Sequence, residues 1–376
     1  MQKTKPNIGW IDLLRILACG LVILSHSCDQ FVAMFDADRT AFLTGSIIGS
    51  FTRPCVPLFA MMTGVLLLPV TESMGSFYRR RIGRIIVPLV FWSIALPVLF
   101  WLYLNFVNPS TANASITDSH TAGATLSKFY LFLFNFNYDT TPLWYLYMLL
   151  GLYLIMPVLS SWLREAPRRD MQIFLGVWVI SLLIPYFKML APALGYEGNY
   201  GNTGLFGVCD WNEFGTFYYV SGFIGYLVLA HYLVKYPVQW SLGRTLAICL
   251  PMFLAGFAIT AAGHIIIQNY YPGQYANLEM IWYFSSFNVM LMTASLFIIV
   301  QKLNAAPRGW MRRMASATFG IYLCHFVFVQ AAYDLFDIAS LPYVVRILGM
   351  AVTTFAVSYV LVRLLSLTKA GRRLVA

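Results

Sequence analysis

Arg15 and His26 are the residues of the first apolar segment whose types and spacing suit chemistry. They are eleven positions apart, so on a helix they share one face, about 16 Å apart along its axis. Asp12 lies one turn before Arg15 and can pair with it, and Asp29 lies one turn after His26 and can orient its imidazole. This set suits acyl transfer, with His26 as a general base, or ion-coupled transport. The alternative is that His26 is a hydrogen-bonded packing residue.

A second group of candidate residues lies in the segment FYRRRIGRIIVP, where four arginines fall within six positions. Guanidinium groups form paired hydrogen bonds with phosphate oxygens, so this cluster can bind an anionic cytoplasmic ligand such as a nucleotide-bearing cofactor. The same cluster can instead mark the cytoplasmic end of a membrane span and contact lipid headgroups. Its members are Arg79, Arg80, Arg81 and Arg84.

Other polar residues occur in or beside apolar segments. Arg53 lies before PCVPLF near the outer end of the second segment, and it comes near His26 if the first two helices pack as a hairpin. Tyr322 and His325 are three positions apart and share a helix face. The six cysteines have no metal-binding spacing, so no metal site is predicted. No role is assigned to the other histidines, His120, His231 and His264.

The helices that position these residues must lie in a membrane. Of the 376 residues, 59% are hydrophobic and 11% are charged, whereas soluble globular proteins have roughly 45–50% and about 25%. A soluble fold of this size cannot bury so many apolar side chains. The composition therefore predicts an all-α integral membrane protein. The net charge of +10 is then a sign of membrane orientation, and no nucleic-acid partner is expected.

Ten apolar stretches are long enough to cross about 30 Å of hydrocarbon as helices. The ten predicted transmembrane helices are residues 8–31, 46–68, 84–107, 143–163, 171–193, 214–234, 245–267, 279–301, 315–336 and 342–366. With the N-terminus in the cytoplasm, 19 of the 25 Lys and Arg residues fall on the cytoplasmic side. The positive-inside rule requires such a bias, so both the N- and C-termini are predicted to be cytoplasmic. The whole chain, residues 1–376, is predicted to be a single membrane domain.

Six segments in order resemble the membrane-bound acyltransferase-3 family of bacterial O-acyltransferases. The first, WIDLLRILACGLVILSH, resembles the first helix of the family, in which an Arg and a His are separated by ten residues. The others are TRPCVPLFAMMTGVLLL, YRRRIGRIIVP with its R-x-x-R, LWYLYMLLGLYLIMPVL, FYYVSGFIGYLV and SATFGIYLCHFVF. The resemblance covers essentially the whole chain. One departure is Pro142, because many members carry a His before the following Leu and Trp.

The resemblance implies an enzyme of the bacterial cytoplasmic (inner) membrane. Such enzymes take an acyl group, usually acetyl from cytoplasmic acetyl-CoA, and place it on a sugar hydroxyl of a cell-envelope or exported polysaccharide. Arg15 and His26 become the functional pair, and Arg81 and Arg84 become the arginines of R-x-x-R. Since the chain ends soon after the tenth predicted helix, it is expected to be of the stand-alone type, without a fused periplasmic hydrolase-like domain.

The expected site therefore has three parts. The catalytic residues are His26, Arg15, Asp12 and Asp29, the donor-binding residues are Arg79, Arg80, Arg81 and Arg84, and the substrate or oxyanion residues are Arg53, Trp144, Tyr145, Tyr322 and His325. The expected partners are acyl-CoA, a glycan acceptor and the lipid bilayer. Two rival functions stay open: a proton- or anion-coupled transporter or flippase, and a non-catalytic partner of a polysaccharide synthase. Transfer is expected to be either direct or through an acyl-histidine intermediate.

Overall fold

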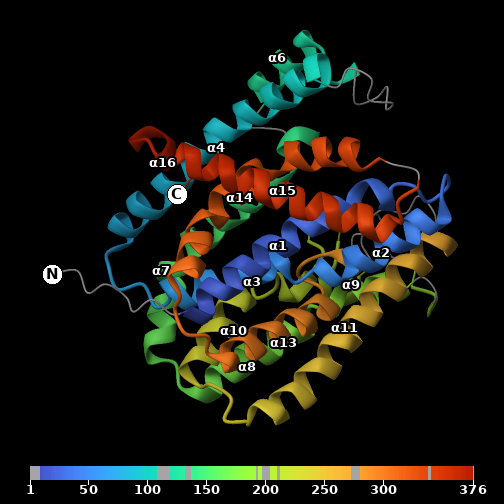
Figure 1. Ribbon diagram of the computed structural model, residues 1–376. Helices are drawn as coiled ribbons and strands as arrows, with labels where there is room; N and C mark the ends of the chain where they lie inside the picture. Colours follow the sequence, from blue (N-terminus) through green and yellow to red (C-terminus); the bar gives the residue numbers. More distant parts are fainter. Residues whose placement is uncertain are drawn as a thin grey trace. The chain divides into compact units, whose positions relative to one another are not determined.

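The structure is a computed structural model that describes residues 9–107, 118–131, 137–191, 194–196, 204–209, 212–271, 280–337 and 340–375. Within these residues it is built of helices (Figure 1). Nine helical stretches of the described chain are long and apolar enough to cross a membrane. They are Gly9–Val32, Arg39–Leu67, Met74–Val107, Tyr138–Glu165, Arg168–Leu190, Leu242–Tyr270, Met280–Leu303, Thr318–Phe336 and Tyr343–Leu365. The chain is therefore an all-α, multi-pass integral membrane protein.

The nine stretches correspond to nine of the ten predicted spans, and the difference lies at the predicted span 214–234. There the structure has a shorter apolar helix, α10 (Ile224–Lys235), of 12 residues, which is about 18 Å long. The preceding residues contain Gly215 and Gly222 with φ of 52° and 73°. This left-handed backbone does not continue a right-handed α-helix. Within the predicted span 214–234, the α-helix is therefore limited to Ile224–Lys235.

The chain divides into two compact units, each assembled from separated stretches. The first unit comprises Met1–Ala18, Ser50–Thr71 and Met156–Pro307, and the second comprises Cys19–Gly49, Glu72–Ile155 and Arg308–Ala376. Three helices pass from one unit to the other: α1 (Gly9–Val32), α2 (Arg39–Thr52) and α7 (Trp144–Glu165). Arg15 thus belongs to the first unit, and His26 belongs to the second.

The first unit is built around closely packed helix pairs. α3 (Cys55–Leu67) packs on α10, and α11 (Leu242–Tyr270) packs on α13 (Phe287–Leu303). A Cβ on Gly64 would lie 2.7 Å from the carbonyl oxygen of Leu227, so the α3–α10 approach requires glycine. The other helices of this unit are α8 (Arg168–Ser181) and α9 (Ile184–Leu190).

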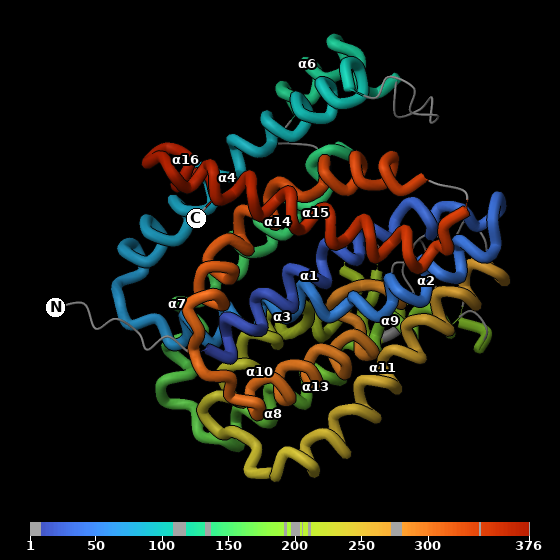
Figure 2. Tube along the Cα trace, in the orientation of Figure 1, coloured from blue at the N-terminus to red at the C-terminus, as the bar shows by residue number. Residues whose placement is uncertain are grey.

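The second unit holds the rest of the helices. α4 (Met74–Leu102) continues into a π-helical turn, and α6 (Ala122–Leu131) and the 3-10 helix η2 (Tyr138–Leu143) pack on α4. α14 (Gly309–Phe336) and α15 (Tyr343–Leu365) run side by side in opposite directions, as Figure 2 shows. The C-terminal helix α16 (Lys369–Val375) packs on α4, α14 and α15.

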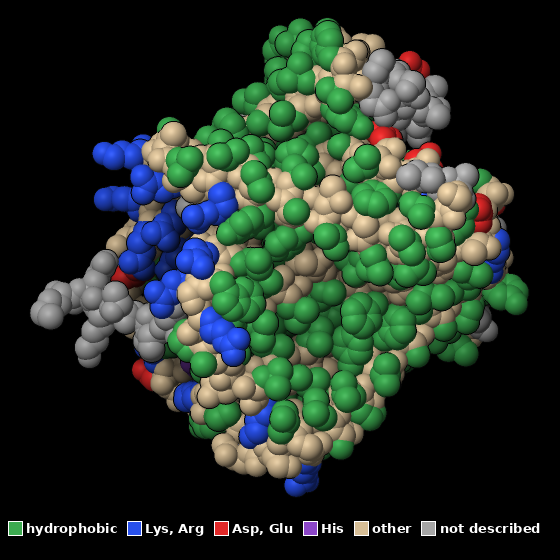
Figure 3. All heavy atoms as spheres, in the orientation of Figure 1, with side chains coloured by type: hydrophobic (Ala, Val, Ile, Leu, Met, Phe, Trp, Pro, Cys, Tyr) green, Lys and Arg blue, Asp and Glu red, His purple; other side chains and the backbone are tan. Residues whose placement is uncertain are grey.

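The surface of the second unit separates apolar from basic side chains (Figure 3). Hydrophobic side chains cover α15, where Val352 and Val360 are exposed. Lys and Arg side chains gather over the first turns of α4 and over α16. Apolar side chains along the helices and basic side chains at one end of them are typical of membrane-spanning helices whose ends lie at a lipid headgroup layer.

Candidate active site

His26 forms a hydrogen-bonded pair with Asp29 on α1. The Nδ1 atom of His26 is 2.8 Å from Oδ2 of Asp29, one turn further along the helix. An ionised carboxylate only accepts hydrogen bonds, so Nδ1 carries the proton and donates it. The other ring nitrogen, Nε2, then carries the lone pair, which is the tautomer that a general base requires. The side chain of His26 is 21% exposed, so the imidazole is partly accessible.

His325 of α14 lies beside His26, with ring centroids 5.3 Å apart. Its Nδ1 donates to the carbonyl oxygen of Tyr322 at 2.7 Å, because a carbonyl oxygen only accepts. Nε2 of His325 is therefore an acceptor, and it is buried with no hydrogen-bond partner among the described residues. An unsatisfied buried acceptor costs about 1–3 kcal/mol. A ligand hydroxyl that donates to it would remove this cost.

Aromatic residues extend the histidine pair within the second unit. The Tyr322 ring lies 5.8 Å from His325 and 5.5 Å from Tyr145, measured between centroids. The hydroxyl of Tyr322 donates to the carbonyl oxygen of Pro142, which is the position where the sequence departs from the family pattern. Trp144 contacts Tyr145 edge to face. The structure thus joins His26, His325, Tyr322 and Tyr145 in one chain of contacts, with Trp144 at its end.

Arg15 pairs with Asp12 in the first unit. Nη1 of Arg15 is 3.4 Å from Oδ1 of Asp12, and the two side chains are 33% and 6% exposed. α1 is unbroken from Gly9 to Val32, so Arg15 and His26 share a helix face with a rise of about 16 Å between them. The partly exposed guanidinium keeps donors available for another group.

Arg53 lies in the turn between α2 and α3, also in the first unit. Its guanidinium carbon is 4.5 Å from the ring centroid of Trp282 and 5.1 Å from that of Phe284. His264, which received no role from sequence, stacks on the same Trp282 at 3.9 Å. Cation–π contacts of this kind hold a guanidinium in a fixed orientation. The predicted hairpin approach of Arg53 to His26 stays a prediction.

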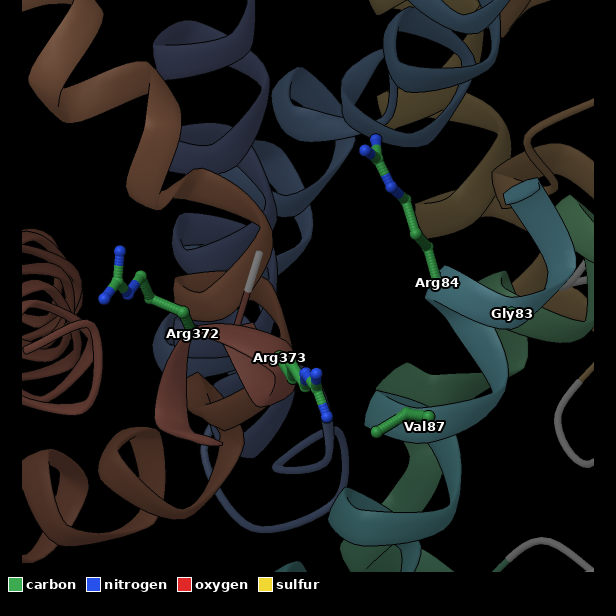
Figure 4. A pocket seen from close by; sticks show the side chains of 5 residues that line it. All are labelled: Gly83, Arg84, Val87, Arg372 and Arg373. Carbon is green, nitrogen blue, oxygen red and sulfur yellow. The ribbon is translucent and has the colours of Figure 1, made fainter. Parts of the chain in front are cut away.

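The four arginines of α4 have different surroundings. Arg80 forms an ion pair with Glu72, and Arg79 is exposed. The Nε atom of Arg81 is buried without a hydrogen-bond partner among the described residues. Arg84 lines a cavity of about 550 Å³ together with Gly83, Val87 and two arginines of α16, Arg372 and Arg373 (Figure 4).

Comparison with known families assigns the chain that carries these residues to a family. A family profile described as an acyltransferase domain, that of the acyltransferase-3 family, matches residues 8–363. The chain belongs to the acyltransferase-3 family. Comparison with curated proteins and with solved structures gives no match. The resemblance predicted from the six segments is confirmed, and membership makes the chain a membrane acyltransferase whose acyl group and acceptor the match does not specify.

The acyltransferase has a polar network beside His26 that the sequence analysis missed. Gln30, one turn after His26, donates to Oε1 of Gln330 at 3.3 Å. Gln330 in turn donates to Asp334 at 3.3 Å, and the hydroxyl of Tyr103 donates to the same carboxylate at 2.6 Å. An ionisable residue inside a span is a signal by default, so Asp334 could have been found from sequence.

A second missed group of this acyltransferase lies in the predicted outer connection 108–142, of which the structure describes residues 118–131 and 137–142. The carboxylate of Asp139 is fully buried. Its Oδ1 lies 2.6 Å from Nε2 of His120, and its Oδ2 lies 2.6 Å from Nζ of Lys128. Their contacts tie α6 to η2. Sequence gave no sign of the pairing, because it depends on how the connection folds back on α4.

Proposed function

We propose that this acyltransferase moves an acetyl group from cytoplasmic acetyl-CoA to a hydroxyl group of a cell-envelope or exported polysaccharide. The family supplies the reaction class. At residue level the proposal rests on the Asp29–His26 pair, which leaves Nε2 of His26 as a base beside the buried acceptor of His325. A sugar hydroxyl must lose its proton to attack a thioester at neutral pH, and a positioned imidazole can take it.

In the proposed reaction, Nε2 of His26 takes the proton of the hydroxyl while the oxygen attacks the thioester carbonyl. The carbon–sulfur bond then breaks, and the departing CoA sulfur takes the proton from the imidazolium of His26. The carboxylate of Asp29 stabilises that imidazolium through Nδ1. In a two-step variant, Nε2 attacks the thioester carbonyl and the carbon–sulfur bond breaks, which leaves an acyl-imidazolium and CoA thiolate. The sugar hydroxyl then attacks the acyl group, the carbon–nitrogen bond breaks to free the imidazole, and the hydroxyl proton passes to the thiolate.

The surrounding residues are assigned by what they can donate or accept. His325 is proposed to accept a hydrogen bond from a second hydroxyl of the sugar, since its Nε2 has no donor among the described residues. Tyr322, Tyr145 and Trp144 supply ring faces on which a sugar can pack. Arg53, held by its aromatic contacts, stays the candidate for stabilising the oxyanion.

Arg15 is assigned to the donor. It lies on the same helix face as His26, about 16 Å away along the axis, which is too far to touch the carbonyl on which His26 acts. We place the pantetheine arm of CoA along this face and the phosphates of CoA at the arginines of α4, of which Arg84 lines the cavity.

We further propose ten membrane crossings, with α10 as the short tenth, and both termini in the cytoplasm of a bacterial cell with this protein in its inner membrane. The positions of 19 of the 25 basic residues support this orientation. A second support is that arginines from the start of α4 and from the C-terminal α16 line one cavity, which requires these two segments to lie on the same membrane face.

Radiolabelled acetyl-CoA tests the proposal. Purified protein in lipid nanodiscs is incubated with labelled acetyl-CoA and polysaccharide extracted from the envelope of a deletion strain. We expect label to enter the polysaccharide when the enzyme is present. We expect release of CoA to require both the enzyme and the polysaccharide. Solute uptake into proteoliposomes without release of CoA would instead support the transporter, and acyl label trapped on the protein without acceptor would favour the two-step variant.

A further inference from the structure

The cavity of the second unit is formed by two helices that are far apart in the sequence. Gly83, Arg84 and Val87 come from the N-terminal half of α4, and Arg372 and Arg373 come from α16 (Figure 4). α16 lies beyond residues 8–363, the part of the chain that matches the family. The arginines of this helix are therefore a feature of this chain that family membership does not assign.

α16 is held firmly against α4. The indole Nε1 of the buried Trp92 donates to the carbonyl oxygen of Leu374 at 2.9 Å. At the start of α16, the backbone N–H of Gly371 donates to Oγ1 of Thr368 at 2.9 Å. A Cβ on Gly371 would lie 2.1 Å from the carbonyl oxygen of Leu365, so the helix sits in close contact with the end of α15. These contacts fix the position from which Arg373 reaches the cavity.

The cavity carries positive charge that the described residues do not balance. Arg84, Arg372 and Arg373 form no ion pair with a carboxylate in the described part of the chain. By contrast Arg80, one turn before Arg84, pairs with Glu72. The positive charges of the arginines that line this space repel each other unless an anion lies near them, and phosphate is an anion that guanidinium groups bind through paired hydrogen bonds.

The space suits more than a single phosphate. Its volume of about 550 Å³ lies in the range of ligand pockets. Nothing lies within 4 Å of a Cβ built on Gly83, so a flat group can approach the α4 backbone there, and Val87 adds an apolar wall. In Figure 4 the side chain of Arg373 extends from α16 toward α4, whereas that of Arg372 extends to the other side.

We infer that Arg373 of α16 and Arg84 of α4 together bind the nucleotide end of the acyl-CoA donor, with the 3′-phosphate bound by the guanidinium group of Arg373. The inference rests on the proposed function for the identity of the donor. The adenine ring then occupies the open space at Gly83 against Val87. A lipid phosphate offers the same anionic group, but it has no planar ring to fill this space.

Equilibrium binding of radiolabelled CoA to the full chain in nanodiscs of neutral lipid tests the inference. CoA itself undergoes no transfer, so binding is measured apart from catalysis. We expect R373Q to weaken CoA binding about tenfold, as loss of one charge-assisted contact predicts. We expect wild type to bind dephospho-CoA about tenfold more weakly than CoA, and R373Q to bind the two equally. The matched control is R363Q, an exposed arginine at the end of α15 that does not line the cavity.

Two further arms separate the alternatives. G83L fills the cavity without removing charge, and we expect it to weaken binding of both nucleotides even if R373Q does not fold. Repeating the wild-type titration with anionic lipid in the nanodisc identifies a lipid site if CoA binding falls in wild type and not in R373Q. The inference would be overturned if wild type, R373Q and G83L bound CoA equally. It would also be overturned if R373Q lost binding of anionic lipid but still bound CoA like wild type. Normal CoA binding without acetyl transfer would instead refute the proposed function alone.

Discussion

The histidine region around His26 and the arginine cavity between α4 and α16 belong to the same unit, and they satisfy their polar groups in opposite ways. His26 and His325 each have Nδ1 engaged by an acceptor of the protein, which leaves a defined nitrogen lone pair on each ring. Arg84 and Arg373 line their cavity with no carboxylate partner among the described residues. The first arrangement fixes where a proton moves, and the second leaves charge available for a ligand. Substitutions in the first should therefore lower kcat, and substitutions in the second should raise KM for the donor.

The largest expected effect is that of His26→Ala. Removing a general base costs about 10²–10⁴ in rate, so we expect kcat for acetyl transfer to fall by about 10³ with KM for acetyl-CoA unchanged. Steady-state kinetics in nanodiscs measures both constants. Gel filtration and membrane yield equal to wild type serve as the folding control, and a variant with wild-type kcat removes His26 from the mechanism.

Asp29→Asn should have the next largest effect. The amide oxygen of asparagine can still accept from Nδ1 of His26, but it carries no charge to stabilise the imidazolium, and we expect kcat to fall by about 10–100-fold. Asp29→Glu keeps the charge and should recover part of the rate. The role of the Asp29 charge would be wrong if D29N and D29E had equal kcat across pH 5–9.

His325→Phe tests the acceptor side of the histidine region. The ring volume is roughly kept while Nε2, the buried acceptor, is lost. We expect KM for the polysaccharide to rise about tenfold, with KM for acetyl-CoA unchanged. Tyr322→Phe, which keeps the ring and loses the hydroxyl that donates to Pro142, is the matched control. A change in KM for acetyl-CoA alone would show that His325 acts in donor binding and not in acceptor binding.

Arg84→Gln should act on the donor. We expect KM for acetyl-CoA to rise about tenfold with kcat unchanged at saturating donor, because one phosphate contact is lost. Arg363→Gln is the matched control, since Arg363 is exposed at the end of α15 and does not line the cavity. Equal KM values for acetyl-CoA in the two variants would show that Arg84 does not bind the donor.

The smallest effect concerns stability away from both regions. Asp38, between α1 and α2, accepts hydrogen bonds from the hydroxyl of Tyr343 and from the backbone N–H groups of Ala41 and Thr40, and these lower the pKa of its carboxyl group. A lowered pKa stabilises the fold above the ordinary pKa of aspartate and loses this contribution as pH falls through the lowered value. We expect Tyr343→Phe to lower Tm slightly at pH 7, and the difference from wild type to shrink below about pH 4. A difference independent of pH would contradict this assignment.

What sequence could predict depends on distance along the chain. Asp12–Arg15 and His26–Asp29 pairs lie within one helical turn, and spacing alone places each on one face. Composition likewise predicts most of the spans. The approach of His325 to His26 and of α16 to α4 depends on packing between distant helices, which no local pattern contains. The predicted span at 214–234 is longer than the α-helix found there, Ile224–Lys235, because positive φ at Gly215 and Gly222 interrupts the apolar stretch.

Single-turnover acetyl transfer at saturating acetyl-CoA tests the central claim most directly, with wild type, H26A and R84Q compared in the same nanodisc preparation. The account predicts that R84Q transfers acetyl at the wild-type rate once donor is in excess, whereas H26A binds CoA like wild type and transfers about 10³-fold more slowly. Transfer by H26A at the wild-type rate, or a deficit in R84Q that excess donor does not restore, would contradict it.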